Sequence, residues 1–369
     1  MELPRPFLSF VAEHGINKKV YDVDPKTIPR YLRTKDGTIT IDELKSEFSI
    51  IEPVHWLESF YAIPSTTNLS TSDLYKSGKV YGLEASDHVL DLCCAPGAKL
   101  AMLADVIGKH GSVTGVDYSK SRISACKSVM HKYELINSSN PWTCRLFHAD
   151  GRNYNQGAPV QATGVAVPTN ENGILEVILD SVEITSRSNK TTSRKRLNKS
   201  ARARLQKHQR EATSSTNSEL FLYDKVLVDA ECTHDGSLRH LAKLTDETKW
   251  AEYLDNYLSP THVENILKLQ HDLIRNGFRL LAPGGRMVYS TCSLSIKQNE
   301  DIVRQFLKDT PSASLLPINS TDVPCQPGGI AHTVRFTPLE GMGGLYVALF
   351  TKIVSSNKGT KRQKVEEQA

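Results

Sequence analysis

The sequence of 369 residues lacks several features that would assign it to a particular class of protein. No apolar run approaches the roughly 20 residues that a membrane-spanning helix needs. The seven cysteines are odd in number and include no C-x-x-C pair, which argues against a disulfide framework and against a zinc site. The N-terminus has no signal-peptide pattern and is not rich in arginine and serine as a transit peptide is. We therefore expect an intracellular protein with reduced thiols, no metal and no membrane association.

Composition sets only broad limits on what the chain does. The formal net charge of +4 is mild and does not by itself indicate nucleic-acid binding. Hydrophobic residues make up 39% of the chain, which is enough to bury a core. The length suits one large domain with appendages, or two domains.

From about residue 86 the chain alternates short apolar runs with amphipathic helical patterns. We expect strands at residues 88–92, 112–116, 143–148, 225–230, 286–290 and 345–351. We expect helices at residues 98–108, 119–133, 261–281 and 298–308, the third of them ended by the Pro-Gly-Gly at 283–285. This alternation predicts an α/β protein with a doubly wound, Rossmann-like parallel sheet.

Two regions flank this main domain, which we place at residues 86–352, and an insertion interrupts it. Residues 1–85 predict a small α+β extension, with short strands at 29–33, 38–41 and 50–51 around a helix at 41–48. Residues 353–369 form a basic tail. An insertion at about 152–219 begins with a possible strand or hairpin at 174–184 and continues into a stretch, 186–210, without any acidic residue. That stretch is either a solvated loop or a segment for phosphate binding or nuclear targeting.

The segment D-L-C-C-A-P-G-A-K at 91–99 joins an expected strand to an expected helix. Such a turn directs backbone N–H groups and a helix N-terminus at a ligand, and Gly97 permits its close approach. Asp117 and Asp150 follow the next two strands, where carboxylates can bind ribose hydroxyls and an adenine amino group. S-adenosylmethionine fits better than NAD, because the G-x-G-x-x-G fingerprint is absent. A tight turn with two capping aspartates is the structural alternative.

Two cysteines, Cys232 and Cys292, each follow an expected strand. A thiol beside a nucleotide-type cofactor pocket has few common uses. One is attack on a pyrimidine ring, which then accepts a methyl group. The alternative for each is a small hydrophobic residue buried in the sheet.

Taken in order, these motifs resemble the Sun-type RNA (cytosine-C5) methyltransferases. Residues 91–100 are similar to that family's D-x-C-A-A-P-G-G-K-T, and 117–123 to its second element. Residues 229–232 resemble its D-A-P-C motif, and S-T-C-S is intact at 290–293. The Q-N-E at 298–300 and the segments at 335–338 and 343–348 resemble its later elements. The resemblance covers roughly residues 75–152 and 220–352, with a weaker likeness at 29–35 and 51–64.

The resemblance implies a methyltransferase domain at 86–352 behind an RNA-binding extension. It makes Cys292 the nucleophile and Cys232 the residue that assists release of the covalent adduct. Asp229 would hold the cytosine, and Lys99 would pair with Asp229 or a nearby backbone group. The residues implied to bind S-adenosylmethionine are Asp91, Cys93, Cys94, Ala95, Pro96, Gly97, Ala98, Lys99, Asp117, Arg122, Asp150 and Asp229.

The implied partner is RNA, either tRNA or rRNA, bound by a monomer in the nucleus or nucleolus, with the cytoplasm left open. One departure weighs on this reading: Glu231 replaces the proline of D-A-P-C, and Thr-His-Asp-Gly at 233–236 replaces the usual Ser-Gly. A carboxylate near a thiol raises its pKa, which puts the role of Cys232 in doubt more than that of Cys292. Milder changes are Ala98 for glycine and Leu100 for threonine. A non-catalytic RNA-binding relative, and a methyltransferase acting on protein or a small molecule, remain as alternatives.

Overall fold

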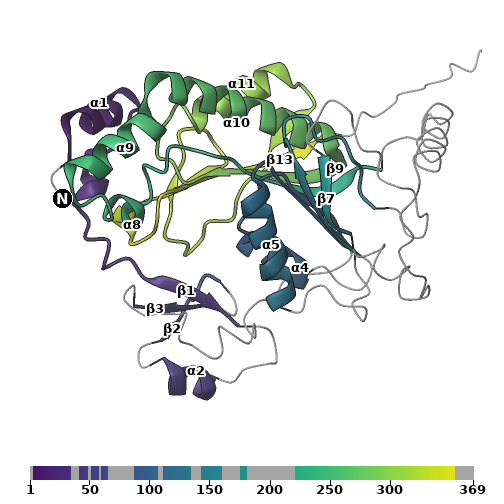
Figure 1. Cartoon of the computed structure of the whole chain (residues 1–369), viewed down its shortest axis with the longest axis horizontal. Coiled ribbons are helices and arrows are strands. Elements are labelled where there is room, and N and C mark those ends of the chain that lie inside the picture. The colour runs from purple at the N-terminus through teal and green to yellow at the C-terminus, as the bar shows by residue number, and fades with distance from the viewer. Residues whose placement is uncertain are drawn as a thin grey trace, which may run out of the picture.

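The computed structural model describes residues 3–34, 41–48, 51–57, 60–64, 87–106, 111–133, 143–159, 175–180 and 221–353. Its centre is a ten-stranded mixed sheet (Figure 1). Five neighbouring strands are parallel, in the spatial order β9 (Leu281–Thr291), β8 (Tyr223–Asp229), β4 (His88–Asp91), β5 (Ser112–Asp117) and β6 (Thr143–Ala149). Read from β6 to β9 and numbered by their order in the chain, these five strands have the spatial order 3-2-1-4-5, so the winding reverses between β4 and β8. The predicted doubly wound α/β fold is confirmed.

Antiparallel strands extend the sheet at both edges, which the alternation pattern alone did not predict. On one side β13 (Leu345–Lys352) pairs with β9 and also contacts β12 (Thr333–Phe336) and β10 (Ala313–Leu315), while β11 (Gln326–Pro327) pairs with β12. On the other side β7 (Leu175–Asp180) pairs with β6. Strand β7 begins opposite Ala149 and ends opposite Arg145, at the amino end of the parallel strands. Strand β8 then starts from that same end at Tyr223.

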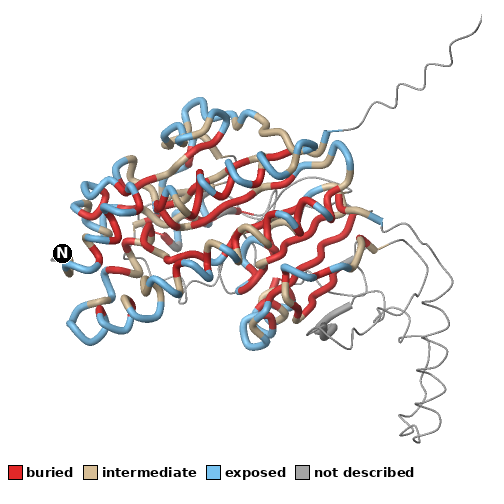
Figure 2. The backbone as a smooth tube through the Cα atoms, turned by 90° about the horizontal axis from the view of Figure 1, so that it is seen from above, coloured by how far each residue is buried: buried red, intermediate tan, exposed pale blue. Residues whose placement is uncertain are grey.

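Helices cover both faces of the sheet and make a three-layer structure (Figure 1). On one face lie α4 (Ala98–Val106) and α5 (Lys120–Lys132), and on the other lie α10 (Pro260–Leu280) and α11 (Glu300–Asp309). Helix α10 buries Val263, Ile266, Gln270 and Leu273, at the three-to-four-residue spacing that places side chains on one helix face. Helix α5 begins where the Ser119 side chain accepts from the Arg122 N–H. The strands between these layers are mostly buried (Figure 2).

The N-terminal residues divide between two places. Helix α1 (Arg5–Glu13) and the 3-10 turn η1 (Lys18–Asp22) pack against α8 (Leu238–Leu241) and α9 (Glu247–Leu258) of the main domain. The Phe7 ring centroid lies 5.4 Å from that of Trp250. Strands β1 (Arg30–Arg33), β2 (Glu52–Pro53) and β3 (Phe60–Ile63) form a separate small sheet with α2 (Ile41–Glu47). Its core comprises Leu32, Leu44, Phe48 and Ile63.

Several predicted boundaries differ from the structure. The Pro-Gly-Gly at 283–285 does not end α10, which stops at Leu280; it lies inside β9, where the pairing with β8 shifts register. Helices α1 and α9 were not predicted. Residue 51 is not in a strand, and β2 starts at residue 52. Of the strand expected at 38–41, residues 38–40 lie outside the described residues and Ile41 begins α2. The basic stretch at 186–210 and most of the tail at 353–369 also lie outside the described residues. No helix within the described ranges has the length and apolar character to cross a membrane.

Candidate active site

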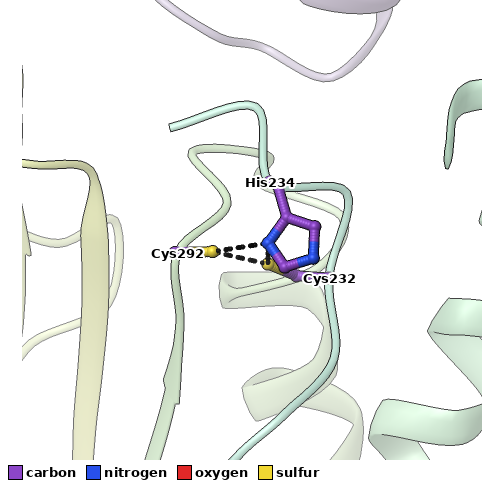
Figure 3. A group of neighbouring side chains, drawn as sticks. All are labelled: Cys232, His234 and Cys292. Atoms are coloured by element: carbon purple, nitrogen blue, oxygen red, sulfur yellow. Dashed lines mark hydrogen bonds between the residues drawn. The ribbon is translucent and has the colours of Figure 1, made fainter. Parts of the chain in front are cut away.

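The two cysteines singled out from the sequence meet at the carboxyl edge of the parallel strands. Cys232 follows β8 and Cys292 follows β9, and these strands are parallel neighbours with Asp229 opposite Ser290. Their Sγ atoms lie 3.1 Å apart (Figure 3). Cys232 is buried, whereas Cys292 is partly exposed. This edge, near the reversal between β4 and β8, is where open α/β sheets bind their ligands.

A buried hydrogen-bond network fixes the two cysteine loops against each other. The Gly236 N–H donates to the Cys292 carbonyl at 3.2 Å, and the Leu294 N–H donates to Asp235 Oδ2 at 2.8 Å. Gln298 Nε2 donates to Thr233 Oγ1 at 2.8 Å. Because each of these side chains is fully buried, an unmatched partner would be costly, and the loops are held in one arrangement.

His234 is the residue of this site that the sequence analysis missed as a functional candidate. Its Nδ1 lies 3.1 Å from Cys292 Sγ and 3.9 Å from Cys232 Sγ (Figure 3). Its φ of 57° is in the left-handed region that favours glycine. The signal was present in the sequence, because this histidine stands two residues after Cys232, within the segment where the family pattern has Ser-Gly.

The two thiols have opposite acid–base character. The hydrogen bond from Cys232, reinforced by His234 and opposed by burial, lowers the pKa of Cys292 to about 6. The same hydrogen bond, together with burial, raises the pKa of Cys232 well above its usual range. At neutral pH, Cys292 is therefore a thiolate and Cys232 a thiol that can donate a proton. This is the division of labour expected of a nucleophile and a proton-transfer partner.

Glu231, which raised doubt about Cys232, is exposed. Its backbone carbonyl accepts a hydrogen bond of 2.7 Å from Gln270 Nε2 on α10. The side chain that reaches the thiols from this loop is instead His234. Glu231 was the reason for considering a non-catalytic relative, and its side chain makes no described contact with either cysteine.

Lys99 and Asp229 form an ion pair beside the thiols. Asp229 also accepts a hydrogen bond of 2.7 Å from Ser290 Oγ, so that β8 and β9 are linked at their ends. Burial alone would lower the pKa of Lys99, but attraction to Asp229 raises it overall. Lys99 is therefore a permanent cation at neutral pH, and its half-exposed side chain lies at the start of α4.

The turn at 91–99 is a tightly bonded unit of backbone and carboxylates. Asp91 accepts from the Cys93 N–H at 3.1 Å, and burial raises the pKa of Asp91 to about 7. Asp117 accepts from the Ala95 N–H at 3.2 Å and from the Ser119 N–H at 2.8 Å. Such capping bonds are what the alternative to cofactor binding predicted for Asp117. A carboxylate has about four lone-pair sites, so the bonds leave acceptor capacity free.

The other residues expected at the cofactor turn occupy its two sides. Arg122 on α5 donates to the Ala95 carbonyl at 2.8 Å and so links α5 to the turn. Pro96, Ala98 and Lys99 are exposed and Cys93 is partly exposed, whereas Cys94 is buried in the core between the sheet, α4 and α5. Asp150 lies apart from this turn, where Arg152 binds both of its carboxylate oxygens.

Gly97 has a packing reason as well as the expected ligand-facing one. Its φ is 106°, and a Cβ added there would lie 2.7 Å from Cys126 Sγ and 3.0 Å from the Cys126 Cα on α5. We expect Gly97→Ala to lower the free energy of unfolding by about 2–3 kcal/mol, because it combines backbone strain with overpacking. Chemical denaturation measures this loss. Gly343→Ala is the matched control, since a Cβ at residue 343 meets nothing within 4 Å; equal losses in both variants would contradict the prediction.

Cys232, His234 and Cys292 are also side chains of metal-binding types, with ligand atoms within 4.8 Å of one another. Two sulfurs bound tetrahedrally to one zinc ion at about 2.3 Å would lie about 3.8 Å apart. The observed 3.1 Å is shorter and suits a hydrogen bond between a thiol and a thiolate. We therefore interpret this group by its thiol chemistry.

Comparison with known proteins places this geometry in a family. The model of the 16S rRNA methyltransferase RsmB/F family matches residues 80–175 and 172–351, which include both cysteine loops and the turn at 91–99. The chain belongs to the RsmB/F methyltransferase family. This membership confirms the resemblance to Sun-type enzymes.

Curated relatives of this RsmB/F-family chain include two named Ribosomal RNA small subunit methyltransferase F. The protein from Erwinia tasmaniensis is 24% identical over 259 residues, covering 70% of this chain and 37% of the relative. The protein from Salmonella arizonae is 23% identical over 331 residues, covering 83% of this chain and 52% of the relative. The RsmB/F-family chain thus spans between about a third and a half of the length of these relatives.

Solved structures share the fold of this RsmB/F-family chain. NSun6 from Pyrococcus horikoshii, solved with SFG, superimposes with a TM-score of 0.59 at 14% identity, covering 95% of this chain and 98% of that one. A methyltransferase homologue from the same organism gives a TM-score of 0.56 at 17% identity, covering 95% of this chain and all of that one.

The predicted nuclear or nucleolar location is wrong. The curated relatives that match this RsmB/F-family chain come from bacteria such as Erwinia, Serratia and Salmonella, and bacteria have no nucleus. The interpretation of the basic stretch at 186–210 as a nuclear-targeting segment is therefore wrong as well. That stretch lies outside the described residues, and its composition alone was the basis for the prediction.

Proposed function

We propose that this chain methylates carbon 5 of cytosine in RNA through a covalent adduct with Cys292. The observation that carries the proposal is the pair of thiols on adjacent strand ends, with Sγ atoms 3.1 Å apart and the pKa of the more exposed one lowered to about 6. A thiolate suits addition to a pyrimidine ring, and a neighbouring thiol can donate a hydrogen bond to the same sulfur when it leaves. The relatives' names support ribosomal RNA as the substrate rather than tRNA.

The reaction divides among the residues around these thiols. The Cys292 thiolate adds to carbon 6 of cytosine, and this makes carbon 5 nucleophilic enough to take a methyl group. The addition pushes electron density into the ring, so N3 takes up a proton from solvent. Asp229, already fixed by Lys99 and Ser290, accepts hydrogen bonds from this N3–H and from the exocyclic amine, and so stabilises the protonated ring. The carbon-5 proton then passes to solvent, the carbon–sulfur bond breaks, the electron pair returns to Cys292 Sγ, and N3 gives its proton back to solvent. The Cys232 thiol donates a hydrogen bond to the departing sulfur and so assists release of the product.

The residues around the turn at 91–99 have the character of an S-adenosylmethionine site. When bound, this cofactor supplies the methyl group as an electrophilic sulfonium. Pro96 and Ala98, both exposed residues, lie at the start of α4 beside Lys99. The remaining acceptor sites of Asp117 suit ribose hydroxyls. The SFG bound by the Pyrococcus NSun6 is consistent with a site of this kind. Asp150 would need to share its carboxylate between Arg152 and the adenine amino group.

A direct assay tests the proposal. The purified chain is incubated with methyl-labelled S-adenosylmethionine and ribosomal RNA, the RNA is digested to nucleosides, and label is expected in 5-methylcytidine. Total tRNA and a protein extract serve as alternative substrates. Label confined to protein, or no label with well-folded chain, would overturn the proposal.

The role of Cys232 gives a second expected result. Cys232→Ala should form the adduct but release it slowly, so that labelled RNA stays attached to the protein in a denaturing gel. Cys292→Ala should form no such complex, because it lacks the attacking sulfur. If both variants behaved alike, the assignment of the two cysteines would be overturned.

A further inference from the structure

His234 occupies a backbone conformation that its side chain does not favour. In the described part of the chain, three residues other than glycine have positive φ: His234, Asp322 and His332. Asp322 and His332 are exposed, whereas His234 is half-buried with Nδ1 3.1 Å from Cys292 Sγ. A left-handed non-glycine residue costs about 1 kcal/mol or more, and such strain at a reactive centre indicates a role for the side chain.

The surroundings of the imidazole hold it against the sulfur. Its ring centroid lies 5.6 Å from that of Tyr257 on α9 and 6.0 Å from that of His240 on α8. From its own loop, Glu231 and Asp235 contribute negative charge near the ring. The hydrogen bond to Cys292 raises the pKa of His234, although burial opposes it, and the repulsion of His240 is too small to reverse the direction. The imidazole is therefore confined between aromatic rings and the thiol, with acidic groups that favour its cation.

We propose that His234 is a further catalytic residue, whose Nδ1 takes the proton of the Cys292 thiol and holds the sulfur as a thiolate. In this step the S–H bond breaks, an N–H bond forms, and the electron pair stays on Sγ. The proton remains on Nδ1 while the sulfur adds to cytosine and leaves again, so the imidazolium–thiolate pair is the same at the end of the cycle as at the start. The proposal rests on the proposed function, because it gives Cys292 the nucleophile's role.

The imidazole–thiolate pair gives a function to the residues that replace the family's Ser-Gly after Cys232. A Ser-Gly in that place offers no group that can hold a proton near neutral pH, whereas imidazole can. The chain replaces a flexible glycine segment by a residue that donates a charge-assisted hydrogen bond to the nucleophile. The Cys232 thiol supplies the second hydrogen bond to the same sulfur, so two donors converge on Cys292.

The test measures the acidity of Cys292 without RNA or cofactor. The rate of alkylation by iodoacetamide is followed against pH in the whole chain, and peptide mass spectrometry assigns the modified cysteine. For the unaltered protein we expect the Cys292 rate to rise through an inflection near pH 6. His234→Gln, which keeps a hydrogen-bond donor but no charge, should move the inflection upward by about one pH unit or more.

Two further variants show whether a shift of the Cys292 inflection comes from the charge of His234, from its backbone conformation or from any nearby positive charge. His234→Gly suits the left-handed φ, so its fold should be kept while its inflection also moves upward. His240→Gln removes a neighbouring histidine that does not contact the sulfur, and its inflection should stay near that of the unaltered protein. In the methylation assay at pH 7, a shift of one unit lowers the thiolate fraction from about nine-tenths to about one half, and a shift of two units lowers it to about one-tenth. His234→Gln should therefore lose roughly twofold to tenfold in rate at pH 7, in step with its measured inflection, and regain this loss at higher pH.

The outcomes distinguish this proposal from the proposed function. An inflection that is unmoved in folded His234→Gln and His234→Gly would overturn the role of His234, whatever the methylation assay gives. A low inflection that depends on His234, in a chain that methylates no RNA, would keep the imidazole–thiolate pair and remove the methyltransferase assignment. Equal shifts of the inflection in His234→Gln and His240→Gln would mean that any nearby positive charge lowers the pKa of Cys292. That result would also overturn the role of His234.

Discussion

Cys292→Ala is expected to abolish methylation, with a loss of at least about three orders of magnitude in rate. The other groups of the site bind and orient cytosine, but none of them is a second nucleophile. Cys232 lies 3.1 Å away, yet it is buried and its pKa is raised well above its usual range, so it is a thiol at neutral pH and cannot take over the attack. Incorporation of label into 5-methylcytidine under single-turnover conditions measures the loss.

The matched control for this variant is Cys325→Ala. Cys325 is also a partly exposed free cysteine, but it lies beside β11 and its pKa is raised by burial, so its removal should leave the rate unchanged. Binding of S-adenosylmethionine, measured by calorimetry, should be kept in both variants. Residual methylation above a few per cent in Cys292→Ala would exclude it as the nucleophile.

Arg335→Met is expected to lower the free energy of unfolding by about 3–5 kcal/mol. Arg335 on β12 donates to both carboxylate oxygens of Glu300, at 2.6 and 2.7 Å, and to the Leu294 carbonyl at 2.7 Å. Glu300 opens α11 and its side chain is only 2% exposed. Without the guanidinium a charged carboxylate stays buried with one backbone donor, the Gly329 N–H. Chemical denaturation followed by tryptophan fluorescence gives the change.

Two comparisons show whether the buried charge is the cause. Arg304→Met breaks an ion pair with Asp301 in which both side chains are about half exposed, and it should cost less than about 1 kcal/mol. The double variant Glu300→Gln with Arg335→Met removes both charges and should be more stable than Arg335→Met alone. Equal effects of Arg335→Met and Arg304→Met would refute the interpretation.

The parallel part of the fold could be predicted from the sequence because its signals are local. Apolar runs such as that at 225–230 and the stripe of Val263, Ile266 and Leu273 repeat at the periods of a buried strand and of a helix face. The order of motifs then located both cysteines at strand ends. The antiparallel edges were less accessible, because the direction of β7 or β13 depends on partners distant in sequence and not on its own pattern.

Residues for the candidate site could be selected from the sequence, but their contacts could not. Cys232, Cys292, Asp229 and Lys99 were each identified, and the structure brings them together. The loop at 231–236 was interpreted through Glu231, since that residue replaces the family proline. Which of its side chains turns inward is decided by the left-handed backbone at His234 and by Gln298 and Asp235, whose bonds form only in the folded chain.

The course of β7 has a consequence for how this chain can change in length. Because β7 runs antiparallel to β6, the chain leaves the sheet after Asp180 at the end remote from the thiols, and it re-enters at that same end to begin β8. Whatever the intervening residues 181–220 do, they join the domain at a place where neither cysteine loop is anchored. The two junctions of that segment with the sheet are thereby separated from the cysteine loops, and they offer a position for a reporter or an affinity tag.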